Sequence, residues 1–242
     1  RETTGSRSAL TEFDDGGGNA LFAGGLFTEA GGVVANRIAK WNGGDWSPLA
    51  SGMDNTVEAL AVFDDGGGPA LYAGGHFITA DGVTVNRIAR WNGSTWSALG
   101  SGISNGGVYS LAVSGTDLYA GGSFTTAGGM SVNNIAKWNG SNWSALGSGL
   151  GGGTSFITVT DLAVSGTDVY AGGGFTTAGS VPASKVAKWN GSNWSALGSG
   201  MNSDVYALVV SGTDVYAGGE FTTAGGVSAN SIAKWNGSSW SA

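Results

Sequence analysis

The side chains that could perform catalytic or metal chemistry are few in this chain. It contains one histidine, His76, and no cysteine, which excludes a disulfide scaffold and a thiolate metal site. The carboxylates include Asp117, Asp168 and Asp214, each closing a Ser-Gly-Thr-Asp segment, where an aspartate typically bonds the backbone of a turn. We interpret His76 as a solvent-facing variant, because equivalent positions hold unrelated residues. We expect no catalytic residue, no metal site, no cofactor and no enzymatic activity.

Two acidic, glycine-rich segments raise the question of calcium. They are Asp14-Asp15-Gly16 and Asp64-Asp65-Gly66. Calcium loops place several oxygen ligands at alternate positions, and two adjacent aspartates fall short of that pattern. We therefore interpret both segments as solvated turns.

A polar side chain that recurs in a longer loop is the candidate ligand-binding position. It is filled by Asn36, Asn86, Asn133, Ser184 and Asn230. With threonine and glycine nearby, these residues could form five equivalent pockets for a glycan, whose weak sites would act together through avidity. The alternative is that each amide bonds the backbone of its own loop.

The elements that must position these residues come from an internal repeat. A tryptophan before Asn-Gly recurs with spacings of 50, 47, 51 and 46, at Trp41, Trp91, Trp138, Trp189 and Trp235. A second tryptophan follows each one, at Trp46, Trp96, Trp143, Trp194 and Trp240. The third and fifth units, residues 108–145 and 205–242, differ at eight of 38 positions. Units of this length are typical of propeller blades.

Each unit has the pattern of a four-stranded sheet. In the third unit we predict strands at 109–113, 118–124, 134–138 and 142–146, joined in pairs by Ser-Gly-Thr-Asp and Asn-Gly turns. No segment keeps a helical apolar period. The predicted fold is all-β: a single five-bladed β-propeller with four antiparallel strands per blade. Residues 1–242 form one domain, with blades at about 1–49, 50–99, 100–146, 147–197 and 198–242.

Packing between blades explains most of the repeated residues. A propeller blade is covered on both faces, and Leu111-Ala112-Val113 is apolar on both sides, as an inner strand should be. The glycine pair after Ala120 would allow neighbouring blades to approach closely. A tryptophan at one place in every unit could stack on sugars, but it is more typical of the core, and we expect the core.

The ends of the chain fall at nearly the same phase of the repeat. We expect the ring to close by packing blade 1 against blade 5, with no strand shared between the termini. The alternative is a piece of a longer array with six or more blades.

Charge and hydropathy limit the classes of partner that the chain could bind. The chain has 10 basic and 17 acidic residues and a net charge of −7, whereas nucleic acids and anionic membranes attract basic patches. No apolar run approaches the roughly 18 residues of a membrane-spanning helix. We expect no nucleic-acid partner and no membrane insertion. The absence of cysteine fits many secreted bacterial proteins, and we expect an extracellular, secreted or cell-surface location.

The repeated string L/V-Y-A-G-G-x-F-T-T-A-G-G…I-A-K-W-N-G-S-x-W-S-A-L-G-S-G resembles the kelch and galactose-oxidase class of propeller repeats. It is also similar to repeat propellers of secreted bacterial proteins and of fungal cortical-marker surface proteins. Galactose-oxidase chemistry needs copper held by several histidines, a tyrosine and a cysteine, so one histidine without cysteine excludes it. The number and length of the units also resemble the five-bladed tachylectin type of sugar-binding propeller, whose binding residues have no match here.

These observations predict a non-enzymatic extracellular interaction or structural module that acts in adhesion or surface assembly. Its partner would be a protein or a glycan at a cell surface. One alternative is a multivalent carbohydrate-binding lectin with repeated weak sites. Another is a fragment of a longer repeat surface protein.

Overall fold

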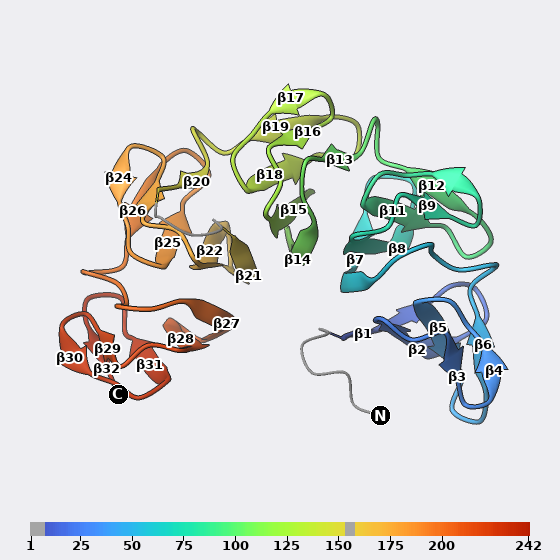
Figure 1. The fold of residues 1–242 in the computed structure, drawn as a ribbon, viewed down its shortest axis with the longest axis horizontal. Helices are drawn as coiled ribbons and strands as arrows, with labels where there is room; N and C mark the ends of the chain where they lie inside the picture. Colours follow the sequence, from blue (N-terminus) through green and yellow to red (C-terminus); the bar gives the residue numbers. More distant parts are fainter. Residues whose placement is uncertain (1–7, 153–157) are drawn as a thin grey trace.

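The structure is a computed structural model that describes residues 8–152 and 158–242. Within these ranges every regular element is a β-strand. Five four-stranded antiparallel sheets, one for each repeat, stand around a common centre as the blades of a β-propeller (Figure 1). The predicted all-β propeller fold is confirmed, and we number the blades 1 to 5 in chain order. The described residues form no helix long and apolar enough to cross a membrane.

Every blade places its strands in chain order from the centre outward (Figure 1). The inner strands are β1 (Ala9–Asp14), β7 (Val57–Asp64), β14 (Val108–Ser114), β21 (Val159–Ser165) and β27 (Val205–Ser211). The second strands are β2 (Asn19–Gly24), β8 (Pro69–Gly75), β15 (Asp117–Gly122), β22 (Asp168–Gly173) and β28 (Asp214–Gly219). The third strands are β5 (Ile38–Trp41), β11 (Ile88–Trp91), β18 (Ile135–Trp138), β25 (Val186–Trp189) and β31 (Ile232–Trp235). The outer strands are β6 (Trp46–Pro48), β12 (Trp96–Ala98), β19 (Trp143–Ala145), β26 (Trp194–Ala196) and β32 (Trp240–Ser241).

A short hairpin, which the sequence pattern did not predict, lies between the second and third strands of each blade. The five hairpins are β3 (Glu29–Ala30) with β4 (Val33–Val34), β9 (Thr79–Ala80) with β10 (Val83–Thr84), β16 (Thr126–Ala127) with β17 (Met130–Ser131), β23 (Thr177–Ala178) with β24 (Val181–Pro182), and β29 (Thr223–Ala224) with β30 (Val227–Ser228). The segment that enters blades 3 and 4 pairs with that blade's hairpin through β13 (Ile103–Ser104) and β20 (Leu150–Gly151). Met53 and Met201 make the equivalent single bridges in blades 2 and 5. In blades 2 to 5 the hairpin therefore holds, by backbone pairing, the segment through which the chain enters the blade.

The third strand begins one residue later than predicted. Asn134 was assigned to it, but Asn134 has a φ of 63° and the strand starts at Ile135. The equivalent residues Arg37, Arg87, Lys185 and Ser231 also have positive φ. A left-handed residue cannot continue a pleated strand, so this position turns the chain from the hairpin into the third strand in every blade.

Neighbouring blades interlock through a valine and a glycine. In the pair Gly121 and Val159, a Cβ added to the glycine would lie 2.6 Å from the valine Cγ1 of the next blade. The same arrangement joins Gly24 to Val57, Gly74 to Val108, and Gly172 to Val205. The first glycine of the pair is thus required by the approach of the next blade, as the sequence predicted.

The tryptophans form pairs whose ring centroids lie 5.2–5.5 Å apart. In blades 2 to 4 both members of each pair are buried, whereas Trp41, Trp46 and Trp235 in the two end blades are half-buried. The Trp143 Nε1 donates to the Leu99 carbonyl of the preceding blade at 2.9 Å, and Trp194 and Trp240 repeat this bond. The interpretation of the tryptophans as inter-blade core is confirmed for blades 2 to 4 and for Trp240, and the other three are only half-buried.

Blades 1 and 5 do not pack against each other, which corrects the prediction of a closed ring. In Figure 1 an opening separates β1 from β27, and no contact comparable to those between the other inner strands joins them in the described chain. Leu10 on β1 is 65% exposed and Ile232 on β31 is 62% exposed. In the sequence, the first unit has Arg7 where the others have the interlocking valine. Among the described residues, the first and last strands, β1 and β32, belong to different sheets, whereas residues 1–7 lie outside the described part of the chain.

Candidate functional site

A pocket of about 500 Å³ lies where the inner strands begin, at the centre of the blades. One residue from each repeat lines it at an equivalent position, and these residues are Ser8, Glu58, Tyr109, Thr160 and Tyr206. We call these five the axial residues. Four residue types occur among them, with tyrosine in both blade 3 and blade 5, although the inner strands of blades 3 to 5 are otherwise similar in sequence. The pocket is therefore the place where differences between the repeats come together.

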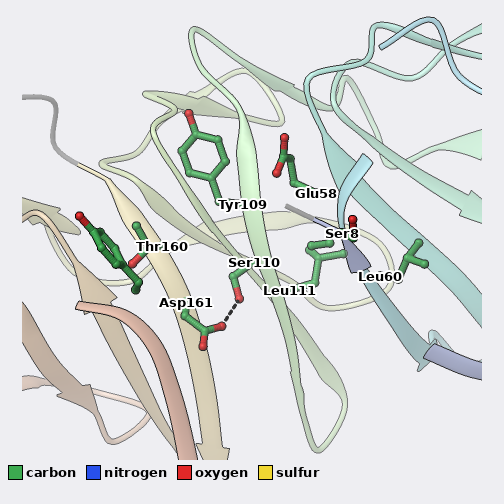
Figure 2. A pocket seen from close by; sticks show the side chains of 10 residues that line it. Ser8, Glu58, Leu60, Tyr109, Ser110, Leu111, Thr160 and Asp161 are labelled. Atoms are coloured by element: carbon green, nitrogen blue, oxygen red, sulfur yellow. Dashed lines mark hydrogen bonds between the residues drawn. The ribbon is translucent and has the colours of Figure 1, made fainter. Parts of the chain in front are cut away.

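A β-bulge positions the axial residues in blades 2 to 5. In blade 3, Val108 pairs with Gly122 and Ser110 pairs with Gly121, so Tyr109 is an additional residue without a partner across the sheet. The same shift in register occurs around Glu58, Thr160 and Tyr206. A bulge bends the strand and re-aims the side chain of the extra residue. Figure 2 shows Glu58 and Tyr109 extending to the same side of the inner strands.

A hydrogen-bonded carboxylate closes the pocket below the axial residues. The Ser110 hydroxyl donates to Asp161 Oδ1 at 3.1 Å (Figure 2). The backbone N–H of Leu208 donates to Asp161 Oδ2 at 2.7 Å, and the N–H of Leu162 donates to Ser110 Oγ at 3.0 Å. Asp161 thereby joins blades 3, 4 and 5 near the axis. Its donors make it a positioning group of the pocket, since a carboxylate that accepts several backbone bonds is held firmly in place.

The axial residues themselves differ in burial and in hydrogen bonding. The Thr160 hydroxyl is buried within hydrogen-bond distance of the carbonyls of Gly172 and Val205. The Tyr109 hydroxyl lies 3.1 Å from Ser123 Oγ. Tyr206 is 41% exposed. The pocket thus combines fixed small polar groups with two tyrosine rings that solvent reaches.

A second set of variable residues borders the axial residues. It follows the glycine pair at the end of the second strand and consists of Leu26, His76, Ser123, Gly174 and Glu220. The His76 ring lies 5.5 Å from the Tyr109 ring, centroid to centroid. His76 is therefore half-buried against the next blade, which corrects its interpretation as a solvent-facing variant. The two sets meet at Tyr109, which contacts His76 and Ser123.

Two carboxylates are among the side chains that line the pocket. Glu58 and Asp161 contribute carboxylates, and no lysine or arginine is among the described residues that line it. The lining also includes Leu60 and Leu111 beside the tyrosines. This mixture of apolar surface, aromatic rings and a few polar groups is typical of a site that binds a ligand by contact.

The predicted ligand-binding position lies elsewhere, in the loop before the third strand. The side-chain amides of Asn36, Asn86 and Asn133 donate to the carbonyls of Ser51, Ser101 and Ser148 at 3.0, 3.0 and 2.7 Å. In these three blades the amide bonds the backbone, but the acceptor belongs to the connection after the outer strand and not to the amide's own loop, as the alternative expected. Ser184 and Asn230 occupy the same position in blades 4 and 5. None of the five lines the axial pocket, and ligand binding by this set stays a prediction.

The turn aspartates are used within the blades. A basic residue of the third strand pairs with each, and the pairs are Lys40 with Asp15, Arg90 with Asp65, Lys137 with Asp117, Lys188 with Asp168, and Lys234 with Asp214. Asp14 and Asp64 accept bonds from the glycine N–H groups of their own loops. Among the described residues no group of three or more histidines or carboxylates is arranged to hold a metal ion.

The ion pair of blade 2 leads to a prediction about acid stability. Burial favours neutral Asp65, but hydrogen bonds from Tyr72 and Gly67 and the charge of Arg90 outweigh it, so the pKa of Asp65 lies below its usual 3.8. A lowered pKa stabilises the fold above pH 3.8, and this contribution is lost as the pH falls through the folded-state pKa. We expect Asp65→Asn to lower the free energy of unfolding by about 1–2 kcal/mol at neutral pH. The difference from wild type should shrink in acid, as measured by urea unfolding across the pH range.

The matched control is Asp15→Asn. Blade 1 has the equivalent ion pair with Lys40, but Phe22 replaces Tyr72 and the tyrosine hydrogen bond is absent. A smaller loss is expected there. Equal losses at neutral pH in the two variants would show that the Tyr72 bond contributes nothing.

The comparisons with known proteins support the fold. No protein-family model and no curated protein sequence matches the chain. Among the solved structures that match is one titled "YCF48 bound to D1 peptide", with a TM-score of 0.52 and 12% sequence identity. The match covers 92% of this chain and 62% of that one, so this chain spans about three fifths of the neighbour's length. At this identity the similarity shows the β-propeller fold alone.

Proposed function

We propose that this chain is a non-enzymatic protein-interaction module whose axial pocket binds a segment of a partner protein. The observation that supports the proposal is the convergence of the axial residues on one pocket. A frame that repeats almost unchanged presents Ser8, Glu58, Tyr109, Thr160 and Tyr206 side by side at its centre. The repeated blades are rigid and hold the axial residues in position, whereas the axial residues themselves vary. Recognition of a partner requires contact residues that are held in this way.

The asymmetry of the pocket favours a protein over a sugar. A lectin of repeated weak sites would have the same residues in each blade, and its sites would be spread around the ring. The axial pocket instead brings four residue types together at one point, with tyrosine in blades 3 and 5, which suits a single asymmetric ligand. Tyrosine is enriched where protein interfaces are strongest, and two of the axial residues are tyrosines. The solved neighbour titled as bound to a peptide is consistent with this choice.

The finer features of the function belong to the same proposal. The kelch-like repeat pattern and the absence of cysteine favour a secreted or cell-surface protein that acts in adhesion or surface assembly. The lectin alternative rests on the five loop positions that include Asn133.

A display library of random peptides, selected against the whole chain, tests the proposal. The selected peptides should bind with Kd values that rise about tenfold or more in Tyr109→Ser, because a central interface tyrosine often contributes over 1 kcal/mol. Binding should be unchanged in Asn133→Ser, a substitution that blade 4 already carries as Ser184. Both variants are compared with wild type by titration calorimetry.

Two results would contradict the proposal. One is that peptide binding survives Tyr109→Ser. The other is that a glycan array identifies defined sugars whose binding is lost in Asn133→Ser and kept in Tyr109→Ser. The second result would support the lectin, because it would assign recognition to the loop position.

A further inference from the structure

The outward face of blade 5 has the same residues that the other blades bury beneath their successor. In blades 1 to 4 the first residue of the third strand is fully buried, and these residues are Ile38, Ile88, Ile135 and Val186. Its equivalent in blade 5, Ile232, is 62% exposed. Tyr216 is half-buried, whereas its equivalents Tyr72, Tyr119 and Tyr170 are buried. The face therefore has the composition of a blade interface without the cover of one.

Gly218 of blade 5 lacks the valine and leucine neighbours that the equivalent glycines of the other blades have. A Cβ added to Gly172 would lie 2.6 Å from Val205 Cγ1 and 3.2 Å from Leu208 Cδ1 of the next blade. At Gly218 the nearest atoms are 3.8 and 3.9 Å away, and both belong to blade 5 itself. The space that a valine and a leucine fill at the other four junctions is open here. We call the face formed by Gly218, Tyr216 and Ile232 the open socket.

We propose that the open socket is a docking surface for one further repeat of the same type as the five in this chain. The four interfaces within the chain define the occupant, because each socket takes a valine and a leucine from the inner strand of the following repeat. The open socket continues that series. An apolar face of this kind is stabilised when a matching surface removes it from water.

Blade 1 fits the socket poorly, whether it comes from this chain or from a second copy. The first repeat provides Leu10, which corresponds to Leu208, but it has Arg7 where the others have valine. An arginine at that place would bring a charge against an apolar surface, which costs free energy unless the charge is paired. Val209, 57% exposed on the same blade, enlarges the apolar surface that the occupant would cover.

Cysteine labelling can test the proposal, because the chain has no cysteine of its own. In the chain as it stands, Ile232→Cys should react rapidly with a soluble thiol reagent, and Val186→Cys, its buried equivalent in blade 4, should react slowly. A second chain is then made in which Ala242 is followed directly by another copy of residues 197–242, which keeps the repeat in phase. In this longer chain the labelling of Ile232→Cys should slow by about tenfold or more, because reaction then requires a local opening.

The control is the longer chain with aspartate in place of the valine that corresponds to Val205 in the added copy. It should lose the protection, because a charge cannot fill the socket. Two results would overturn the proposal. Rapid labelling of Ile232→Cys in the longer chain would show that the socket does not accept a repeat. Slow labelling already in the shorter chain would show that blade 1 or a second copy covers the face, and dependence of the rate on protein concentration would identify the second copy.

Discussion

Replacing Trp143 with alanine is expected to lower the free energy of unfolding by about 3–5 kcal/mol, the usual range for deleting a buried tryptophan. Trp143 is 6% exposed and packs against Trp138 with ring centroids 5.4 Å apart. Its indole N–H also donates to the carbonyl of Leu99, which follows the outer strand of blade 2. The alanine variant would leave a cavity and remove one of two donors of the Leu99 carbonyl, which still accepts from the Gly102 N–H at 3.1 Å, so the loss should come mainly from the cavity. Urea unfolding measures it.

The control is Trp46→Ala in blade 1. Trp46 has the same partner in its own sheet, Trp41, at a centroid distance of 5.5 Å, but it is half-buried at an end of the array. Its loss should be clearly smaller than that of Trp143. A loss of the same size in both variants would show that the pair stabilises its own blade and contributes nothing between blades.

Replacing Gly121 with valine is expected to destabilise the chain by about 1–3 kcal/mol or more, as overpacking of a close-packed interior does. The new Cβ would lie 2.6 Å from Val159 Cγ1 and 3.3 Å from Leu162 Cδ1. Valine has few rotamers with which to move aside, so blades 3 and 4 must separate. Gly121 has no positive φ, and the backbone itself tolerates a side chain. The effect would therefore report on the contact between blades.

Gly218→Val is the matched control for this prediction. It adds the same side chain at the equivalent position of blade 5, where the nearest atom is 3.8 Å away. Its midpoint of unfolding should stay close to that of wild type, and β-propensity favours valine over glycine in a strand. If Gly218→Val were as destabilising as Gly121→Val, the interlocking of blades could not be the reason for the glycine.

The repeated residues were sufficient to predict the architecture because each has a strong physical requirement. Asn-Gly marks the hairpin between Trp138 and Trp143, and the glycine pair at Gly121 marks the close approach of the next blade. The short hairpins were missed because strands of two residues, such as Thr126–Ala127, show no alternation of apolar and polar residues. The bulge at Tyr109 was missed for a related reason, since one additional residue leaves the composition of a strand unchanged.

The sequence contained indications of the open ring and of the axial pocket, but they are residues that differ between the repeats. A search for residues that the repeats share overlooks them. Arg7 was visible as the exception to the interlocking valine. Among the differences between the third and fifth units, Ser110 against Ala207 and Ser123 against Glu220 lie at or beside the pocket. We predicted ligand binding at the Asn133 position because four of the five repeats have asparagine there. Constant residues in a repeat report on the frame, and recognition by one asymmetric site depends on the residues that differ.

The most direct test of the central claim is to make the axial residues alike. The substitutions Glu58→Ser, Tyr109→Ser, Thr160→Ser and Tyr206→Ser, introduced together, give every blade the residue that blade 1 has in Ser8. Asp161 and the interlocking residues remain, so the midpoint of unfolding should change by only a few degrees. Binding of the selected peptides, measured by titration calorimetry, should be lost in this variant. Peptide binding that persists with an unchanged Kd would contradict the claim that the protein recognises its partner at the axis.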